Sequence, residues 1–232
     1  MTPSNKFEQV RATLKRPLRS LAHLRKENSG VAFIEFAFAA PIFLSLGLMG
    51  TETAYYVITH MQVSQVAMQV ADNASRVGEA DVLEEKRVFE DDITEVFVGA
   101  EKLGAGIGVF EQGRIILSSL QQNSEGGQWI AWQRCRGKKN HTSSYGLEDE
   151  GKTGTAFEGM GANTTKIKSS AGTAVMFVEI SYTYESLTPF NFLEGRVIDY
   201  TAAFNIRDSR DLTRLYGASD GQAVASCTQF TA

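Results

Sequence analysis

Residues 31–49 read VAFIEFAFAAPIFLSLGLM, an apolar run of 19 residues in which Glu35 is the only charged side chain. At a rise of 1.5 Å per residue, a helix of this length spans about 28 Å, which matches the hydrocarbon thickness of a bilayer. Pro41 removes one backbone hydrogen bond and is expected to kink the helix, which a membrane helix tolerates. The run therefore predicts one N-terminal transmembrane helix.

The charge of the chain is unevenly distributed around this run. Residues 1–30 carry seven basic and two acidic side chains, a net charge of +5, so the rest of the chain holds −9 of the total of −4. Basic groups before a span favour a cytoplasmic N-terminus. We therefore expect residues 1–30 in the cytoplasm and everything after the helix to be exported. An acidic body would repel phosphate, so nucleic acid is not an expected partner.

Two other interpretations of the apolar run stay open. It could be a cleaved secretory signal, with Ala37-Phe38-Ala39 as the small-residue site, although the apolar part before that site is short and contains a glutamate. It could also be a buried core helix of a soluble protein. The length of the run and the basic residues before it favour a membrane anchor over both.

The chain has two cysteines, Cys135 and Cys227, both far beyond the apolar run. If this region is exported, a disulfide between them is the expected pairing, because oxidising compartments sustain disulfides. Two unpaired thiols are the alternative. Two cysteines at this separation do not form a zinc site, which usually needs four clustered ligands.

Glu35 needs an explanation, because a carboxylate in the hydrocarbon layer costs about 3 kcal/mol. It is the fifth residue after Gly30. If the chain were cut between Gly30 and Val31, a new ammonium would appear on Val31, and Glu35 of a neighbouring subunit could neutralise it. Two buried opposite charges need each other. Alternatively, Glu35 simply lies near the headgroups.

The stretch GVAFIEF at residues 30–36, behind a basic leader, resembles a type IV pilin-like leader. The stretches TETAYY at 51–56 and ADNASRVG at 71–78 extend the resemblance to the TadE/TadF-like pseudopilins, minor components of bacterial Tad (Flp-type) pilus assembly systems. The resemblance covers about residues 25–80. It implies cleavage by a prepilin peptidase at Gly30-Val31 and a role for Glu35 in assembly. The implied partners are the lipid bilayer, other pilin-like subunits and pilus assembly proteins. The implied location is the bacterial inner membrane, with a periplasmic C-terminal domain.

Helical periodicity continues past the apolar run. An apolar stripe at Val63, Val66 and Val70 runs beside a seam of small residues that includes Ala67 and Ala71. This face could pack against other pilin-like subunits or against the protein's own domain. A second helix is expected over residues 81–98, ended by the glycines that follow.

The remainder of the sequence predicts strands at 107–110, 114–120, 128–134, 174–184 and 197–206, which are rich in β-branched and aromatic residues. The polar, glycine-rich residues 137–171 predict a long surface loop. The expected fold is therefore α+β, a long N-terminal helix followed by a small domain with an antiparallel sheet, as in pilins. We expect a leader (1–30), a transmembrane helix (31–50), an amphipathic helical region (51–99) and an exported β-rich domain (100–232).

No catalytic centre, metal site, cofactor or nucleotide is expected. Residues 146–153, GLEDEGKT, match the phosphate-binding loop pattern, but the polar sequence before them is not a strand and three acidic residues would face the phosphates. Among the histidines, His23 and His60 cannot meet in one exported site, and His141 is expected to be a solvated loop residue. The alternative function is a membrane-tethered periplasmic enzyme or ligand-binding domain, which would need a clustered polar site in residues 107–232.

Overall fold

The computed structural model describes residues 29–79, 85–162, 164–217 and 224–232. The chain divides into two compact units, with the boundary between Thr51 and Glu52. The described part of the first unit is helical throughout, as the beginning of α2 (Ser29–Ala74). The helix continues through Pro41. Residues 1–28 of the predicted leader, His23 among them, lie outside the described residues.

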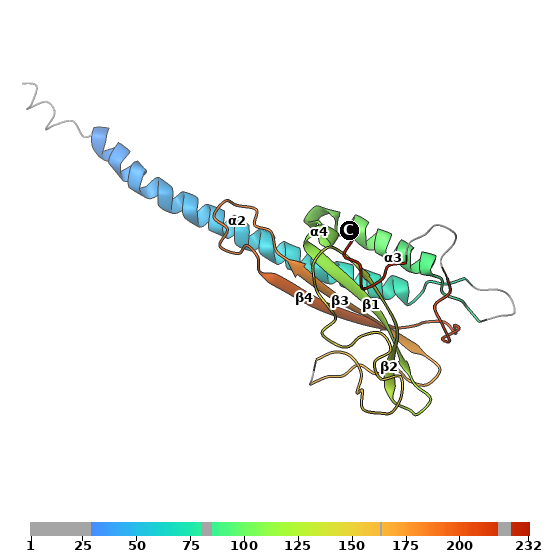
Figure 1. The fold of residues 1–232 in the computed structure, drawn as a ribbon. Coiled ribbons are helices and arrows are strands. Elements are labelled where there is room, and N and C mark those ends of the chain that lie inside the picture. The colour runs from blue at the N-terminus through green and yellow to red at the C-terminus, as the bar shows by residue number, and fades with distance from the viewer. Residues whose placement is uncertain (1–28, 80–84, 163, 218–223) are drawn as a thin grey trace, which may run out of the picture. The chain divides into compact units, whose positions relative to one another are not determined.

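The second unit is built on a four-stranded antiparallel sheet (Figure 1). Its strands are β1 (Gly113–Gln122), β2 (Gln128–Arg136), β3 (Ala174–Thr183) and β4 (Val197–Asn205), in the spatial order β2-β1-β3-β4. Each of the three neighbouring pairs is antiparallel. The predicted α+β class, with a long apolar helix before an antiparallel sheet, is confirmed.

One face of the sheet packs on helices. The C-terminal half of α2 contributes the fully buried Val63 and Ala67, and α3 (Glu90–Leu103) contributes Ile93 and Phe97, to one core with β1 and β3. The apolar stripe and the small-residue seam of α2 thus cover the protein's own sheet over residues 63–74. A helix with small residues on one face can approach a sheet closely, which explains why alanines alternate with valines there.

The opposite face of the sheet is covered by the segment that the sequence predicts to be a surface loop. Met160 from this segment is fully buried against Leu120, Ile130 and Phe177. Although the segment contains no strand within its described residues, it supplies the side chains that keep the second face of the sheet dry. The prediction that it is irregular holds, but the prediction that it lies only on the surface is wrong.

Two local predictions are corrected. Residues 107–110 are not a strand: they fall in a 3₁₀ turn, η1 (Ala105–Ile107), and a short helix, α4 (Val109–Gln112), separated by Gly108 in the left-handed region at φ 59°. Short β-branched runs do not distinguish strand from helix. The second helix begins at Glu90 rather than at 81, because the Asp92 carboxylate accepts a hydrogen bond from the Phe89 N–H (2.8 Å) and caps the helix there. It ends at Leu103, and residues 80–84 lie outside the described residues.

Candidate anchoring and assembly site

The predicted processing and assembly residues lie at the beginning of α2. Gly30 and Val31 are in its first turn, and all three side-chain positions, Gly30, Val31 and Glu35, are exposed. Among the described residues, the Glu35 carboxylate has no hydrogen-bond or ion-pair partner. Its partner in any buried environment therefore has to come from outside the described chain.

The surface of α2 over residues 31–49 is apolar and exposed. Phe33, Phe38 and Phe43 are each more than 70% exposed, which a water-facing helix would not sustain. Within the described residues this is the one helix that is long and apolar enough to cross a membrane. Since apolar area of this extent needs an apolar environment, lipid or another apolar helix is required to cover it.

A buried carboxylate marks the point where the apolar run gives way to the domain. Glu52 is fully buried and accepts hydrogen bonds at Oε1 from Tyr184 Oη (2.7 Å) and Ser186 Oγ (2.6 Å). The backbone N–H of Thr188 donates to Oε2 (2.8 Å), and the N–H of Leu187 adds a longer contact of 3.4 Å to Oε1. We call these five residues the Glu52 junction. It ties α2 to the connection between β3 and β4.

The Glu52 junction holds its carboxylate in the charged form. Burial alone would raise the pKa of Glu52, but the hydrogen bonds from Ser186, Tyr184 and Thr188 outweigh burial and lower the pKa from 4.5 to about 2. Burial and the neighbouring Glu52 carboxylate raise the pKa of Tyr184, so its hydroxyl stays a donor. A carboxylate that accepts several strong hydrogen bonds can remain ionised without a cation beside it.

Aromatic rings surround the Glu52 junction on its helix side. The ring of Tyr184 lies 4.9 Å from that of Tyr56 in an edge-to-face arrangement and 6.0 Å from that of Tyr55. Tyr56 in turn packs edge-on against His60, at 4.7 Å. Rings with polar edges are enriched where a membrane meets water. The first turns of α2 after the apolar run therefore carry the residue types expected at a membrane boundary.

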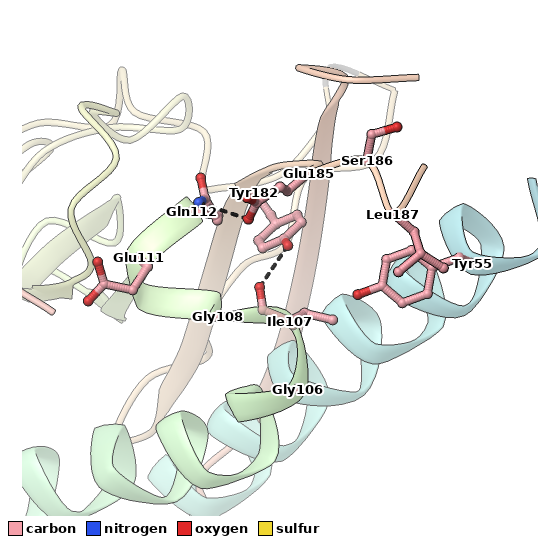
Figure 2. Close-up of a pocket in the computed structure, with 10 residues that line it drawn as sticks. All are labelled: Tyr55, Gly106, Ile107, Gly108, Glu111, Gln112, Tyr182, Glu185, Ser186 and Leu187. Atoms are coloured by element: carbon pink, nitrogen blue, oxygen red, sulfur yellow. Dashed lines mark hydrogen bonds between the residues drawn. The ribbon is translucent and has the colours of Figure 1, made fainter. Parts of the chain in front are cut away.

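An open pocket of about 560 Å³ lies at the same end of the domain (Figure 2). Tyr182 Oη donates to the Ile107 carbonyl (2.7 Å) across one wall, and Gln112 Nε2 donates to Glu185 (3.2 Å) across another. Among the described residues that line the pocket, two carry carboxylates and none is basic. The lining residues are Tyr55, Gly106, Ile107, Gly108, Glu111, Gln112, Tyr182, Glu185, Ser186 and Leu187. The pocket shares Ser186 and Leu187 with the Glu52 junction.

The C-terminal segment is fastened to the sheet by a disulfide and a buried arginine. Cys135 on β2 is bonded to Cys227, at a sequence separation of 92. Arg114 on β1 is fully buried and donates to the carbonyls of Cys227 (2.7 Å), Gln229 (3.0 Å) and Gly137 (2.9 Å). Its guanidinium also stacks on Phe230, 4.1 Å from the ring centroid. Burial lowers the pKa of Arg114, and the three carbonyls replace the water lost by its two terminal nitrogens.

His141, Ser143 and Glu179 resemble part of a catalytic site but have a structural role. His141 is not a solvated loop residue, because its Nε2 lies 2.8 Å from Glu179, a buried carboxylate that also accepts from Ser143 Oγ (3.0 Å). Ser143 and His141 both bind the carboxylate rather than each other, so they do not form a nucleophile–base pair. The described residues contain no group of three or more His, Cys, Asp or Glu side chains placed to hold a metal ion.

The segment GLEDEGKT, residues 146–153, forms hydrogen bonds with the edge of β2. The Asp149 N–H donates to the Ile130 carbonyl (2.8 Å), and the Ile130 N–H donates to the Glu150 carbonyl (3.0 Å). Asn123 Nδ2 fixes the segment further through the carbonyls of Gly151 (2.8 Å) and Gly154 (2.7 Å). Backbone groups that pair with a strand are not available to surround a phosphate.

Sequence reasoning missed the Glu52 junction. Glu52 belongs to the quoted stretch TETAYY, where a carboxylate three residues beyond an apolar span is a visible signal. Its partners, however, lie more than 130 residues away in the chain. The buried Arg114 was missed for the same reason, because its acceptors come from two segments, at Gly137 and at Cys227 and Gln229, that are distant from it in the chain.

The comparisons with known proteins point to the N-terminal helix. Residues 30–72 match the family model described as TadE-like protein, and this match begins at Gly30. No curated protein and no solved structure matches the chain significantly. The matched range covers the apolar run, the Glu52 position and most of the remainder of α2, which is the region in which the sequence resembles TadE/TadF-like pseudopilins. Over residues 30–72, the chain is similar to TadE-like proteins.

Proposed function

We propose that this protein is a minor pilin-like structural component, a pseudopilin, of a bacterial Tad (Flp-type) pilus assembly system. It is made with a cytoplasmic leader, spans the inner membrane once through residues 31–49, and exposes its α+β domain to the periplasm. A prepilin peptidase cuts between Gly30 and Val31. Its role in assembly is carried by α2, and no enzymatic activity is part of the proposal. The observation that carries it is the TadE-like match beginning at Gly30.

The proposed topology is supported by charge and by redox chemistry. The seven basic residues before α2 favour a cytoplasmic leader. The Cys135–Cys227 disulfide lies after the helix and is typical of an oxidising compartment such as the periplasm. Both features support the same orientation, with the leader in the cytoplasm and the domain in the periplasm.

Glu35 supplies the proposed assembly step. Cleavage leaves an ammonium on Val31, and in the bilayer this charge and the Glu35 carboxylate are each costly without a partner. Within the described residues Glu35 has no such partner. When two pilin-like helices lie side by side with a small axial shift, the carboxylate of one can bind the new ammonium of the other. Pairing thus favours assembled over isolated helices.

The first prediction concerns the mature N-terminus. In the native host with an active prepilin peptidase, the protein is expected to begin at Val31, and intact-mass spectrometry of the purified protein measures the loss of residues 1–30. A Gly30→Val variant is expected to keep its leader, because a branched side chain replaces the hydrogen that the peptidase accommodates at the cut. A mature wild-type protein that still begins at Met1 would contradict processing. A new terminus after Ala39 would instead favour a secretory signal.

The second prediction separates assembly from processing. A Glu35→Gln variant is expected to be cleaved normally and to reach the membrane, but to lower pilus output by about tenfold, because an unneutralised ammonium costs more than 1.4 kcal/mol in lipid. Pili sheared from the cells and quantified by immunoblot provide the measurement. Glu101→Gln, at an exposed position of α3, is the matched control for a glutamate outside the span. Unchanged pilus output in the Glu35→Gln strain would rule out the proposed role of Glu35.

A further inference from the structure

The connection between β3 and β4 carries an uncharged, exposed tip. Residues 187–193 read LTPFNFL, between Glu185 and Glu194. Leu187 is 58% exposed, Phe190 57% and Phe192 42%. Large apolar side chains grouped in this way on a loop mark an interaction surface, because water does not stabilise them there. We call residues 187–193 the apolar tip.

The apolar tip is held in a defined conformation. At its base, the Tyr184 N–H donates to the Arg196 carbonyl (2.8 Å) and the Gly195 N–H donates to the Tyr184 carbonyl (3.0 Å), which closes the loop as a hairpin. Pro189 restricts the backbone within it. Its phenylalanines are therefore exposed on a loop that has a defined conformation.

The Glu52 junction fixes the apolar tip to α2 at one position. Three of the donors to the Glu52 carboxylate, from Ser186, Leu187 and Thr188, belong to the first residues of the tip or directly precede it. Figure 2 shows Leu187 lying beside Tyr55 of α2, and both residues line the same pocket. If the tip moved away from the helix, the buried Glu52 carboxylate would lose hydrogen-bond donors or become exposed to water.

The Glu52 junction lies close in sequence to the end of the proposed membrane span. Glu52 is three residues after Met49, so along a helix it stands about 4.5 Å beyond the end of the apolar run. The headgroup layer on each side of the hydrocarbon is about 5–8 Å thick. If residues 31–49 span the bilayer, a loop bonded to Glu52 begins at the depth of the headgroups, where lipid can reach it.

We propose that the apolar tip inserts Leu187, Phe190 and Phe192 into the periplasmic interface of the bilayer, as a second membrane contact beside the α2 span. This inference rests on the proposed anchoring of residues 31–49. Apolar side chains at the boundary between headgroups and acyl chains gain area-dependent stabilisation, and the lack of charge in the tip avoids the desolvation of an ion. The contact would fix the rotation and tilt of α2 relative to the membrane before assembly. A protein partner for the tip is the alternative that the experiment must exclude.

The test measures the membrane depth of single labels in the full-length protein. Both native cysteines form the disulfide, so an introduced cysteine can be labelled selectively with an environment-sensitive fluorophore. The protein is reconstituted into vesicles of phosphatidylethanolamine and phosphatidylglycerol that contain shallow or deep doxyl-labelled lipids. Phe190→Cys reports the tip and Phe43→Cys the span. Leu147→Cys is the matched control, because Leu147 is 55% exposed on the 137–171 segment.

The expected result is that shallow doxyl lipids quench the Phe190 label at least about twofold more than the Leu147 label, and that shallow lipids quench it more than deep lipids do. Equal quenching at Phe190 and Leu147, with strong quenching at Phe43, would overturn the inference and leave the anchor intact; the tip would then face water or a protein. No quenching at Phe43 would overturn the proposed anchor itself. In that case, quenching at Phe190 would still support the tip as a membrane contact, and its absence would overturn both.

Discussion

Replacing Glu52 by alanine is expected to lower the free energy of unfolding of the domain by about 3 kcal/mol, because the Tyr184 and Ser186 hydroxyls and the Thr188 N–H lose their acceptor in a buried place. For a domain of this size, that corresponds to a fall in melting temperature of about 6–12 °C. Thermal unfolding of the full chain in detergent, followed by near-ultraviolet circular dichroism, measures it. Glu101→Ala, an exposed glutamate of α3, is the matched control and is expected to change stability little.

The same carboxylate predicts how stability depends on pH. The pKa of Glu52 is about 2 in the folded protein and 4.5 when unperturbed, so its contribution is complete above pH 4.5 and is lost as the pH falls from 4.5 toward 2. Hydrogen bonds from Thr213 and Tyr216 also lower the pKa of Asp211 to about 2, so Asp211 contributes in the same window. A Glu52→Gln variant is expected to lose less stability than the wild type between pH 4.5 and 2. An Asp211→Asn change added to it should flatten the profile further. Parallel pH profiles of wild type and Glu52→Gln would contradict this account.

The second large effect is expected from the disulfide. A Cys135→Ala/Cys227→Ala variant should lose about 4 kcal/mol of stability, because the bond closes a loop of 92 residues and restricts the unfolded chain. The variant should also loosen residues 224–232, so the Gly137 N–H, which donates to the Thr231 carbonyl (2.7 Å), should exchange its hydrogen faster. Chemical unfolding and hydrogen exchange measure the two effects.

Reduction supplies the control for the double variant. Wild-type protein treated with a reductant is expected to unfold at the same denaturant concentration as the double variant, since both lack the same covalent bond. Arg114 remains under the C-terminal segment in either case and keeps its hydrogen bonds to carbonyls as long as the segment is docked. A change smaller than about 1 kcal/mol in both samples would show that the Arg114 contacts alone are sufficient to hold the segment.

Local sequence patterns were sufficient to predict those helices and strands whose residues form one continuous, strongly patterned stretch of chain. The apolar helix follows from 19 apolar residues with a single charge, and four of the five expected strands follow from runs of β-branched and aromatic residues. The fifth, at residues 107–110, failed because the run is short. Gly104 and Gly108 turn the chain there, and the Gly104 position would place a Cβ only 2.4 Å from the Val109 side chain.

By itself, then, the sequence determined the apolar helix, the basic residues before it, the α+β class and the resemblance carried by Gly30 and Glu35, because length, charge and periodicity are properties of neighbouring residues. Only the tertiary structure decided which polar groups are buried and what satisfies them. Glu52, Arg114 and Glu179 look like ordinary surface charges in the sequence. Each becomes buried because distant segments supply its hydrogen-bond partners, and the free energy of a buried charge depends on those partners rather than on the residue that carries it.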